Sequence, residues 1–245
     1  MRVARPLLRR ARWLLVSAAI AAAGLFLWGY GRNNPEDVPW TRLDLTRPVG
    51  AFTRAKLAGL QGAGARCRAL LRHAGVVFTP LPPRSEGPQC GYDDAVRLSG
   101  GAATIDYAPP GMGTSCPVAA ALSLWEWHVV QPAAVKRLGS RVATVETFGA
   151  YNCRRMYGRA TGDWSEHARA NAIDIAGFVL EDGRRISVAG DWLAKDARGR
   201  FLQDVRDGAC RLFTHTLSPD YNAAHRDHFH LDEAGKGAWG WRACR

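Results

Sequence analysis

Residues 171–188, with the sequence NAIDIAGFVLEDGRRISV, decide the fold predicted for this chain. An apolar run is followed by the turn triplet Glu-Asp-Gly at 181–183 and then by the shorter apolar pattern Ile-Ser-Val. This order predicts a β-hairpin. Side chains along a strand alternate between its two faces, so Ile173 and Ile175 should enter the core while Asp174 faces a cleft.

A second segment, residues 225–231 with the sequence HRDHFHL, has the same alternating pattern. Phe229 and Leu231 would pack in the core, and His228 and His230 would then share the opposite face of the strand. A β-strand is an economical way to aim two imidazole rings at one point.

Imidazole and carboxylate groups are concentrated in two short segments, because residues 165–174 (SEHARANAID) and 225–231 contain four of the seven histidines. His167 lies seven residues before Asp174, on the loop that would enter its strand, and folding back would bring it to the same site. Two histidines and one aspartate beside an open position are typical of a hydrolytic zinc site. We therefore expect one Zn²⁺ ion per chain.

The remainder of the chain predicts helices around this small sheet. Apolar residues recur at helical spacing in 55–73, 116–130 and 199–213, and a second short helix should follow Pro132. Residues 142–148 alternate as a further strand. The predicted fold class is therefore α+β, with a small antiparallel sheet that carries the zinc site and helices that flank it.

The first thirty residues have the composition of a membrane address. Residues 1–12 are basic, and residues 13–30 carry no charge over a length that approaches the thickness of a bilayer core at about 1.5 Å per residue. Cations before an apolar helix keep its N-terminus in the cytoplasm. We therefore expect a cytoplasmic segment (1–12) and an uncleaved signal anchor (13–30) in the inner membrane, with the rest of the chain in the periplasm.

The apolar segment could also be cleaved, and a spacer is expected after it. The alanine-rich run 18–23 offers a small-residue cleavage site, and cleavage there would release a soluble periplasmic protein instead. Residues 31–55 contain turn signals without sustained periodicity, so they are expected to form a spacer that holds the domain off the membrane. Residues 56–245 would then form the domain.

The distribution of charge argues against a nucleic-acid-binding protein, and the cysteines indicate an oxidising compartment. The formal charge is +11, but six arginines lie within the first 32 residues and no long basic run follows, so no nucleic-acid partner is expected. All six cysteines follow the membrane segment, which predicts disulfides in an oxidising compartment. Fifteen pairings are possible among Cys67, Cys90, Cys116, Cys153, Cys210 and Cys244.

The spacing Ser165-x-His167-x6-Asp174, followed by His228-x-His230, resembles the zinc signature of the LAS metallopeptidases. This group includes D-Ala-D-Ala peptidases and murein endopeptidases. The resemblance implies that zinc is held by His167, Asp174 and His230.

The other polar residues of the second motif also have counterparts in that group. The series His225-x-x-His228-x-His230 resembles that of the penicillin-insensitive murein endopeptidases, in which the earlier histidines line the active site. Asp227 occupies the position at which the carboxypeptidase and amidase-like members place their catalytic carboxylate. The resemblance thus implies catalytic roles for His225, His228 and Asp227, and it leaves Asp227 and His228 as alternative bases.

A longer set of motifs is similar to the bacterial extensin-like C-terminal domain family, and this resemblance extends from about Cys67 to Asp232. One departure from the peptidase pattern is Ala170, where many LAS members have glycine. The family motifs are YNCR at 151–154, SEH at 165–167, NAIDIAGF at 171–178 and HFHLD at 228–232.

These resemblances imply a zinc metallopeptidase, of the murein endopeptidase or carboxypeptidase type, that cleaves a peptide bond in peptidoglycan. Zinc would acidify its bound water toward a pKa of about 7, and Asp227 or His228 would take the proton and pass it to the leaving amine. The LAS group commonly has an arginine shortly before its first zinc motif. Arg154, or else Arg155, would therefore hold the oxyanion or a substrate carboxylate.

Other interpretations belong to different classes of protein. The domain could retain its metal without turnover, as a peptidoglycan-binding or envelope-scaffolding module. The histidines could also be unrelated surface residues, or the zinc could be structural and closed by Asp227 or His228 as a fourth ligand. A serine hydrolase is poorly supported, because the chain has no Gly-x-Ser-x-Gly motif.

Overall fold

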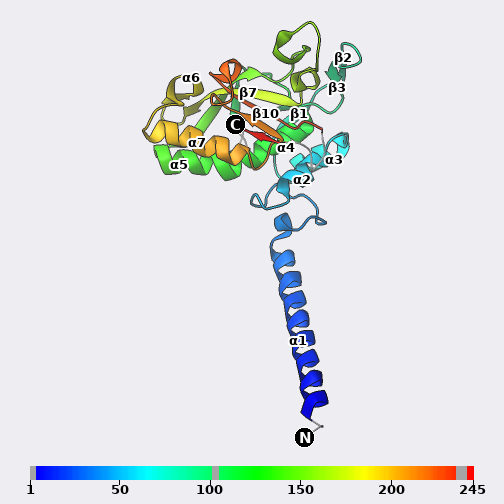
Figure 1. Cartoon of the computed structure of the whole chain (residues 1–245). Coiled ribbons are helices and arrows are strands. Elements are labelled where there is room, and N and C mark those ends of the chain that lie inside the picture. Colours follow the sequence, from blue (N-terminus) through cyan, green and yellow to red (C-terminus); the bar gives the residue numbers. More distant parts are fainter. Residues whose placement is uncertain (1–3, 101–104, 236–241) are drawn as a thin grey trace.

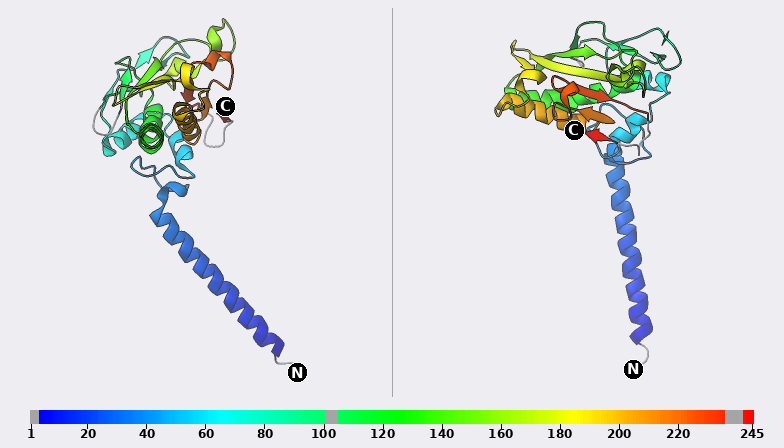
Figure 2. Two further views of the ribbon diagram at one scale, coloured as in Figure 1. Left: turned by 90° about the vertical axis from the view of Figure 1, so that its left-hand side faces the viewer. Right: turned by 45° about the horizontal axis from the view of Figure 1, so that its top comes forward.

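The computed structural model describes residues 4–100, 105–235 and 242–245 of the chain. The long helix α1 (Ala4–Asn33) projects from a folded body in every view (Figures 1 and 2). An 18-residue window within residues 9–33 of α1 has a mean hydropathy of 1.8, and none of that window is buried against the body. The helix thus has the length and composition of a membrane anchor or of a signal sequence.

The body is built on a mixed β-sheet of seven strands, counted among the described residues, in the order β11-β9-β10-β7-β6-β5 with β8 paired to β7. The pairs formed by β6, β7, β8, β9 and β10 are antiparallel, whereas β5 joins β6, and β11 joins β9, in parallel. The small antiparallel sheet expected from the sequence is therefore the centre of a larger one. Its strands are β5 (Asp106–Ala108), β6 (Val142–Gly149), β7 (Ala172–Leu180), β8 (Arg185–Ser187), β9 (His215–Leu217), β10 (Phe229–Asp232) and β11 (Ala243–Cys244).

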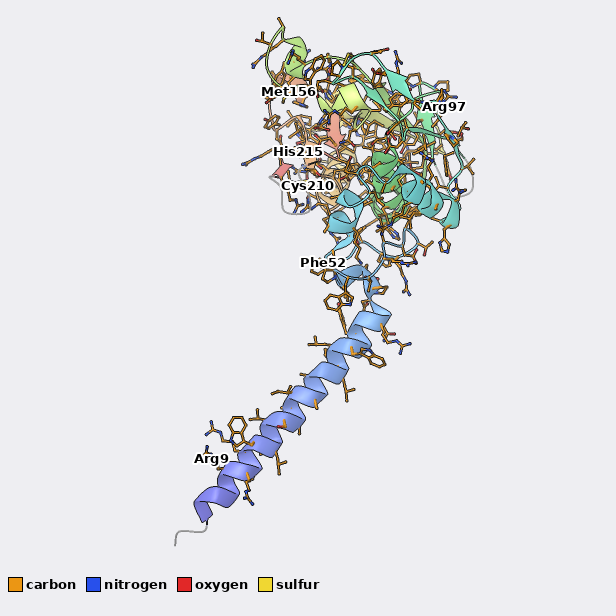
Figure 3. All side chains as sticks on the ribbon, turned by 90° about the vertical axis from the view of Figure 1, so that its right-hand side faces the viewer. Arg9, Phe52, Arg97, Met156, Cys210 and His215 are labelled. Atoms are coloured by element: carbon orange, nitrogen blue, oxygen red, sulfur yellow. A yellow bond between two sulfur atoms is a disulfide. The ribbon has the colours of Figure 1, made fainter. Side chains whose placement is uncertain are left out.

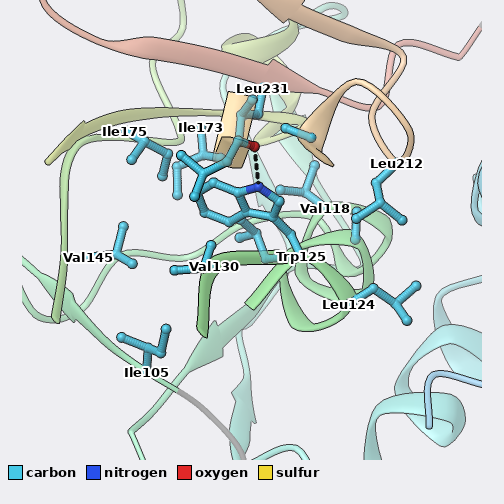
Figure 4. Close-up of a cluster of buried hydrophobic side chains, with 14 of the residues drawn as sticks. Ile105, Val118, Leu124, Trp125, Val130, Val145, Ile173, Ile175, Leu212 and Leu231 are labelled. Carbon is cyan, nitrogen blue, oxygen red and sulfur yellow. Dashed lines mark hydrogen bonds between the residues drawn. The ribbon is translucent and has the colours of Figure 1, made fainter. Parts of the chain in front are cut away.

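Three helices cover one face of this sheet: α4 (Cys116–Trp125), α5 (Gln131–Leu138) and α7 (Ala197–Ala209) (Figure 1). Trp125 of α4 is fully buried against Phe178 of β7, and its indole N–H donates to the carbonyl oxygen of Val205 at 2.8 Å (Figure 4). The apolar residues of the two motif strands point into the same core, so the predicted faces are confirmed. These residues are Ile173, Ile175, Phe229 and Leu231, all 0 % exposed.

Two predicted helices differ from the observed ones. The helix expected over 55–73 is broken into α2 (Thr53–Ala58) and α3 (Gly64–His73), because the glycine-rich residues between them include Gly62 at φ +70°. The helix expected over 116–130 leaves the α-helical path after Trp125 and continues as a π-helical turn, η2 (Glu126–Val130), directly into α5. A widened turn at this point accommodates Pro132, which has no N–H to donate.

The remaining predicted elements are confirmed. The strand over 142–148 is β6, the hairpin is β7 and β8, and the helix over 199–213 is α7, which begins two residues earlier and ends at Ala209. All six cysteines form disulfides, which join Cys67 to Cys116, Cys90 to Cys153 and Cys210 to Cys244. The smaller elements are η1 (Pro35–Asp37), β1 (Phe78–Pro80), β2 (Arg84–Ser85), β3 (Gly91–Tyr92), β4 (Val96–Leu98), η3 (Met156–Gly158), η4 (Glu166–Arg169), α6 (Val188–Asp191) and η5 (Ala223–His225).

Candidate metal centre

His167, Asp174 and His230 come together on the polar face of the sheet. Asp174 of β7 and His230 of β10 are direct partners in the antiparallel register of these strands. His167 lies in η4, and the left-handed backbone of the next residue after this helix, Ala170 (φ +53°), turns the chain into β7. Such a backbone favours glycine, which accounts for the residue expected there, and alanine adopts it at a cost of about 1 kcal/mol.

The three candidate ligand atoms form a nearly equilateral triangle. His167 Nε2 lies 3.2 Å from Asp174 Oδ1 and 3.2 Å from His230 Nδ1, and His230 Nδ1 lies 3.0 Å from Asp174 Oδ1. In a tetrahedral zinc site, bonds of about 2.0–2.1 Å place neighbouring ligand atoms about 3.3 Å apart. The observed triangle therefore fits three ligands of a tetrahedral site, whose fourth vertex would be taken by water or substrate in a hydrolytic centre.

Each histidine of this triangle is oriented by a hydrogen bond at the ring nitrogen that does not belong to the triangle. His167 Nδ1 lies 2.8 Å from the carbonyl oxygen of Ala150, so this nitrogen must carry the proton and Nε2 presents its lone pair. His230 Nε2 lies 3.0 Å from Asp232 Oδ2, which directs the Nδ1 lone pair toward Asp174 when the ring is neutral. Hydrogen bonds of this kind fix the orientation of metal-binding histidines.

The electrostatics of the cluster favour a cation. Burial alone would raise the pKa of Asp174, but its close contacts with the imidazole rings of His167 and His230 outweigh burial and hold its pKa well below the usual range. Burial likewise opposes ionisation of Asp232, yet hydrogen bonds from His215 and His230 lower its pKa to about 2. Burial disfavours the imidazolium of His230, but its bonds to the two carboxylates raise its pKa to about 9. Two ionised carboxylates thus meet at His230, and a metal ion would replace its Nδ1 proton.

His228 and Asp227 form a pair beside the triangle. His228 Nδ1 lies 2.8 Å from Asp227 Oδ1, and its Nε2 lies 3.6 Å from Asp174 Oδ1. His228 lines the cleft in front of the triangle, whereas Asp227 does not belong to the cleft wall. The carboxylate of Asp227 is therefore positioned to fix the tautomer of His228 and reaches the cleft through it.

His225 also turns toward this cluster. Its Nδ1 lies 2.8 Å from Asn222 Oδ1, and its ring centroid lies 5.3 Å from that of His228 and 5.8 Å from that of His230. Burial, together with the neighbouring histidines, lowers the pKa of His225 to about 4. His225 is therefore a neutral imidazole at physiological pH and a weak base.

The cluster lies in the wall of a cleft of about 950 Å³. Arg154 lines this cleft, whereas Arg155 stacks on the ring of Trp164 at 4.6 Å and donates to the carbonyl oxygen of Gly162. Of the two arginines considered from the sequence, Arg154 is thus the one that faces the site. Other lining residues are Gln89, Met156, Tyr157, Arg169 and Tyr221.

Several residues that build the site were not singled out from the sequence. Asp232 is the main one, and it follows His230 by two positions in a strand, so alternation alone places both side chains on one face. Asn171 supports the cluster from behind, because its amide donates to the Glu233 carbonyl at 2.6 Å and its side-chain oxygen accepts from Ser115 at 3.0 Å. No local sequence pattern predicts this supporting role of Asn171, because Ser115 and Glu233 are distant from it in the sequence.

The chain was compared with curated proteins, with solved structures and with protein families. No curated protein and no solved structure matches the chain. The family described as Extensin-like protein C-terminus matches residues 65–245, which cover most of the chain and include the whole of the candidate metal centre. The chain therefore belongs to the extensin-like C-terminus family.

Proposed function

We propose that this protein is a zinc-dependent hydrolase that cleaves a peptide bond in peptidoglycan in the cell envelope. The observation that carries the proposal is the triangle of His167 Nε2, Asp174 Oδ1 and His230 Nδ1, with sides of 3.0–3.2 Å, in the wall of a large cleft. The resemblance of the same three residues to the LAS zinc signature supports the same ligands and the same class of substrate.

The ligand set suits hydrolysis. Zinc held by two imidazoles and one carboxylate would supply a Lewis acid and an acidified water at neutral pH. His228 Nε2 is the base nearest to the triangle, 3.6 Å from Asp174 Oδ1, and it would accept the proton of the attacking water and return it to the leaving amine. Asp227, bonded to His228 Nδ1, would hold the ring in that tautomer and stabilise the imidazolium.

The other cleft residues would bind the substrate. Arg154 offers a permanent cation on the cleft wall, suited to a substrate carboxylate or to the oxyanion of the tetrahedral intermediate. His225, held neutral by its low pKa of about 4, would present Nε2 to the substrate as a hydrogen-bond acceptor rather than as a proton donor.

The proposed location is the periplasmic face of the inner membrane. α1 would be an uncleaved anchor, with the basic residues at its start in the cytoplasm. The three disulfides of the body support an oxidising compartment for the domain. The alternative of a cleaved signal sequence predicts a protein without α1, which the mass of the purified chain distinguishes.

Incubation of the purified full chain with peptidoglycan sacculi tests this function. We expect release of peptides from zinc-loaded protein, loss of release after chelation, and loss in the His228→Ala variant with its metal retained. Zinc-loaded wild-type protein that binds sacculi and releases nothing would contradict the hydrolase and support a binding or scaffolding module instead.

A further inference from the structure

Residues 34–52, which we call the collar, connect α1 to the body as a folded segment. Val38, Leu43 and Leu45 of the collar are only 8 %, 5 % and 1 % exposed, and the two leucines belong to the main hydrophobic core. The expected spacer over 31–55 thus packs against the domain along much of its length. A segment packed in this way holds the domain close to the end of α1.

The end of α1 is fixed to the collar by specific contacts. Tyr30 Oη of α1 donates to Asp37 Oδ2 at 2.7 Å, and Asp37 Oδ1 accepts from the backbone N–H of Ala51 at 2.7 Å. Lys56 Nζ of α2 donates to the carbonyl oxygen of Pro35 at 2.6 Å and to Thr41 Oγ1 at 2.7 Å. Both ends of the collar are therefore tied to the last turn of α1 and to the body.

The collar lies where α1 meets the body (Figures 1 and 2), and Phe52 marks that junction in Figure 3. The uncharged stretch of α1 ends at Gly31, two residues before the helix itself ends. The headgroup layer on each side of a bilayer is roughly 5–8 Å deep. If α1 spans the membrane, the collar must therefore lie in or directly above that layer.

The exposed chemistry of this end suits an anionic membrane surface. From residue 32 to residue 48, every charged residue in the exposed class is an arginine, whereas the three acids are partly buried. Asp37 accepts from Tyr30 and Ala51, and Asp44 accepts from Thr46. The exposed cations are Arg32, Arg42 and Arg47, and the partly buried acids are Glu36, Asp37 and Asp44.

The exposure of Trp40 also suits a membrane surface. Its side chain is 84 % exposed, although burial is the usual state of so large an apolar group. Tryptophan is enriched at membrane–water interfaces, where its indole lies at the level of the headgroups. Close by in the chain, Arg42 and Arg47 line an open cleft of about 390 Å³ together with His73 and with Asp44, whose carboxylate accepts from Thr46.

We propose that the collar is a docking surface for anionic phospholipid headgroups, with Trp40 in the interfacial layer and Arg42 and Arg47 paired with lipid phosphates. This role goes beyond the proposed hydrolysis and requires only that α1 remains attached and spans the membrane. Juxtamembrane arginines attract anionic lipids, and a tryptophan between them resists withdrawal into water. Docking would fix the orientation of the domain, with the cleft rim at Met156 at the end remote from α1 (Figure 3).

Tryptophan fluorescence of the full chain in vesicles tests the proposal. The Trp40→Phe variant isolates the contribution of Trp40, because the other eight tryptophans remain. In vesicles of equal parts phosphatidylcholine and phosphatidylglycerol, we expect this contribution to be quenched by brominated lipid and protected from aqueous iodide. In phosphatidylcholine alone, the quenching by brominated lipid should fall at least twofold.

Charge reversal separates docking from simple proximity. The Arg42→Glu/Arg47→Glu variant should lose the lipid quenching of Trp40, whereas the matched control Arg97→Glu, on the body away from the collar (Figure 3), should keep it. Iodide quenching of Trp40 that is as strong in the mixed vesicles as in detergent would overturn the proposal. Lipid quenching that is unchanged by the double charge reversal, or recovery of a chain without α1 from cells, would overturn it as well. None of these readouts depends on turnover, so failure of docking and failure of the hydrolase are distinguishable.

Discussion

His230 and Asp174 face each other across the β10–β7 pair with His230 Nδ1 3.0 Å from Asp174 Oδ1, while the other ring nitrogen of His230 lies 3.0 Å from Asp232 Oδ2. The imidazole is thus clamped between two carboxylates, one on the neighbouring strand and one on its own strand. In the proposed metal centre, Nδ1 would therefore be the ligand atom and Nε2 would donate its proton to Asp232. The sequence motif alone does not distinguish the two nitrogens.

The Asp232→Asn variant tests the role of this second carboxylate. Asparagine can still accept a hydrogen bond from His230 Nε2 but carries no charge, so we expect zinc affinity to fall by about 10–100-fold. Competition with a chelator of known affinity measures this change. The matched control Asp227→Asn removes a carboxylate bonded to His228, which is not a predicted ligand, and should leave the affinity unchanged. Equal losses in both variants would refute the specific role of Asp232.

Rates of peptide release distinguish the two candidate bases. If His228 carries the proton, His228→Ala should reduce turnover by about 10²–10⁴-fold with metal content unchanged. Asp227→Asn should then have a smaller effect, because the imidazole remains and only its orientation is weakened. A larger loss in Asp227→Asn than in His228→Ala would instead identify Asp227 as the base.

The buried carboxyl group of Glu126 should make the free energy of unfolding depend on pH, independently of the metal centre. Burial raises the pKa of Glu126 to about 7, against the opposing hydrogen bonds that its carboxylate accepts from Tyr107 and from the backbone of Ile105. Between its ordinary value of 4.5 and about 7, the folded state therefore binds more protons than the unfolded state. Stability should fall as the pH rises through this window, by about 3 kcal/mol from this residue.

The comparison of wild type with Glu126→Gln isolates this effect, because glutamine does not titrate. Urea unfolding at a series of pH values should show the difference between the two proteins changing between pH 4.5 and about 7 and constant above. The control Glu181→Gln removes an exposed carboxylate 3.6 Å from Arg141 and should show no such step. A difference between wild type and Glu126→Gln that is constant with pH would contradict the assignment.

The disulfide between Cys90 and Cys153 joins two parts of the cleft rim, since their neighbours Gln89 and Arg154 both line the cleft. The bond closes a loop of 63 residues, and its removal in Cys90→Ala/Cys153→Ala should lower stability by about 2–5 kcal/mol. We also expect a raised KM for peptide substrate, because Arg154 would lose its fixed position. Thermal unfolding and steady-state kinetics measure the two effects. An unchanged KM would argue against Arg154 as a substrate ligand.

Much of the site follows from alternation along two strands. The apolar pairs Ile173 with Ile175 and Phe229 with Leu231 determine which face is buried, and this places Asp174 and His230 on the opposite face. Asp232 follows from the same rule.

Other features of the fold and of the site depend on contacts between distant segments, which local sequence patterns do not predict. The parallel edge strands β5 and β11 have three and two residues, too few for a periodic signal, and their register is set by their partners. The disulfide pairing and the support of Asn171 join segments far apart in the chain. The break between α2 and α3 was accessible in principle, because three glycines lie between residues 59 and 64.

Metal content of the purified full chain, measured by plasma mass spectrometry without a histidine tag, tests the central claim most directly. We predict about one zinc ion per chain in the wild type, loss of that zinc in His230→Ala, and retention in the matched variant His228→Ala. A wild-type protein that takes up no zinc when zinc is supplied, or a His230→Ala variant that retains it in full, would contradict the metal centre.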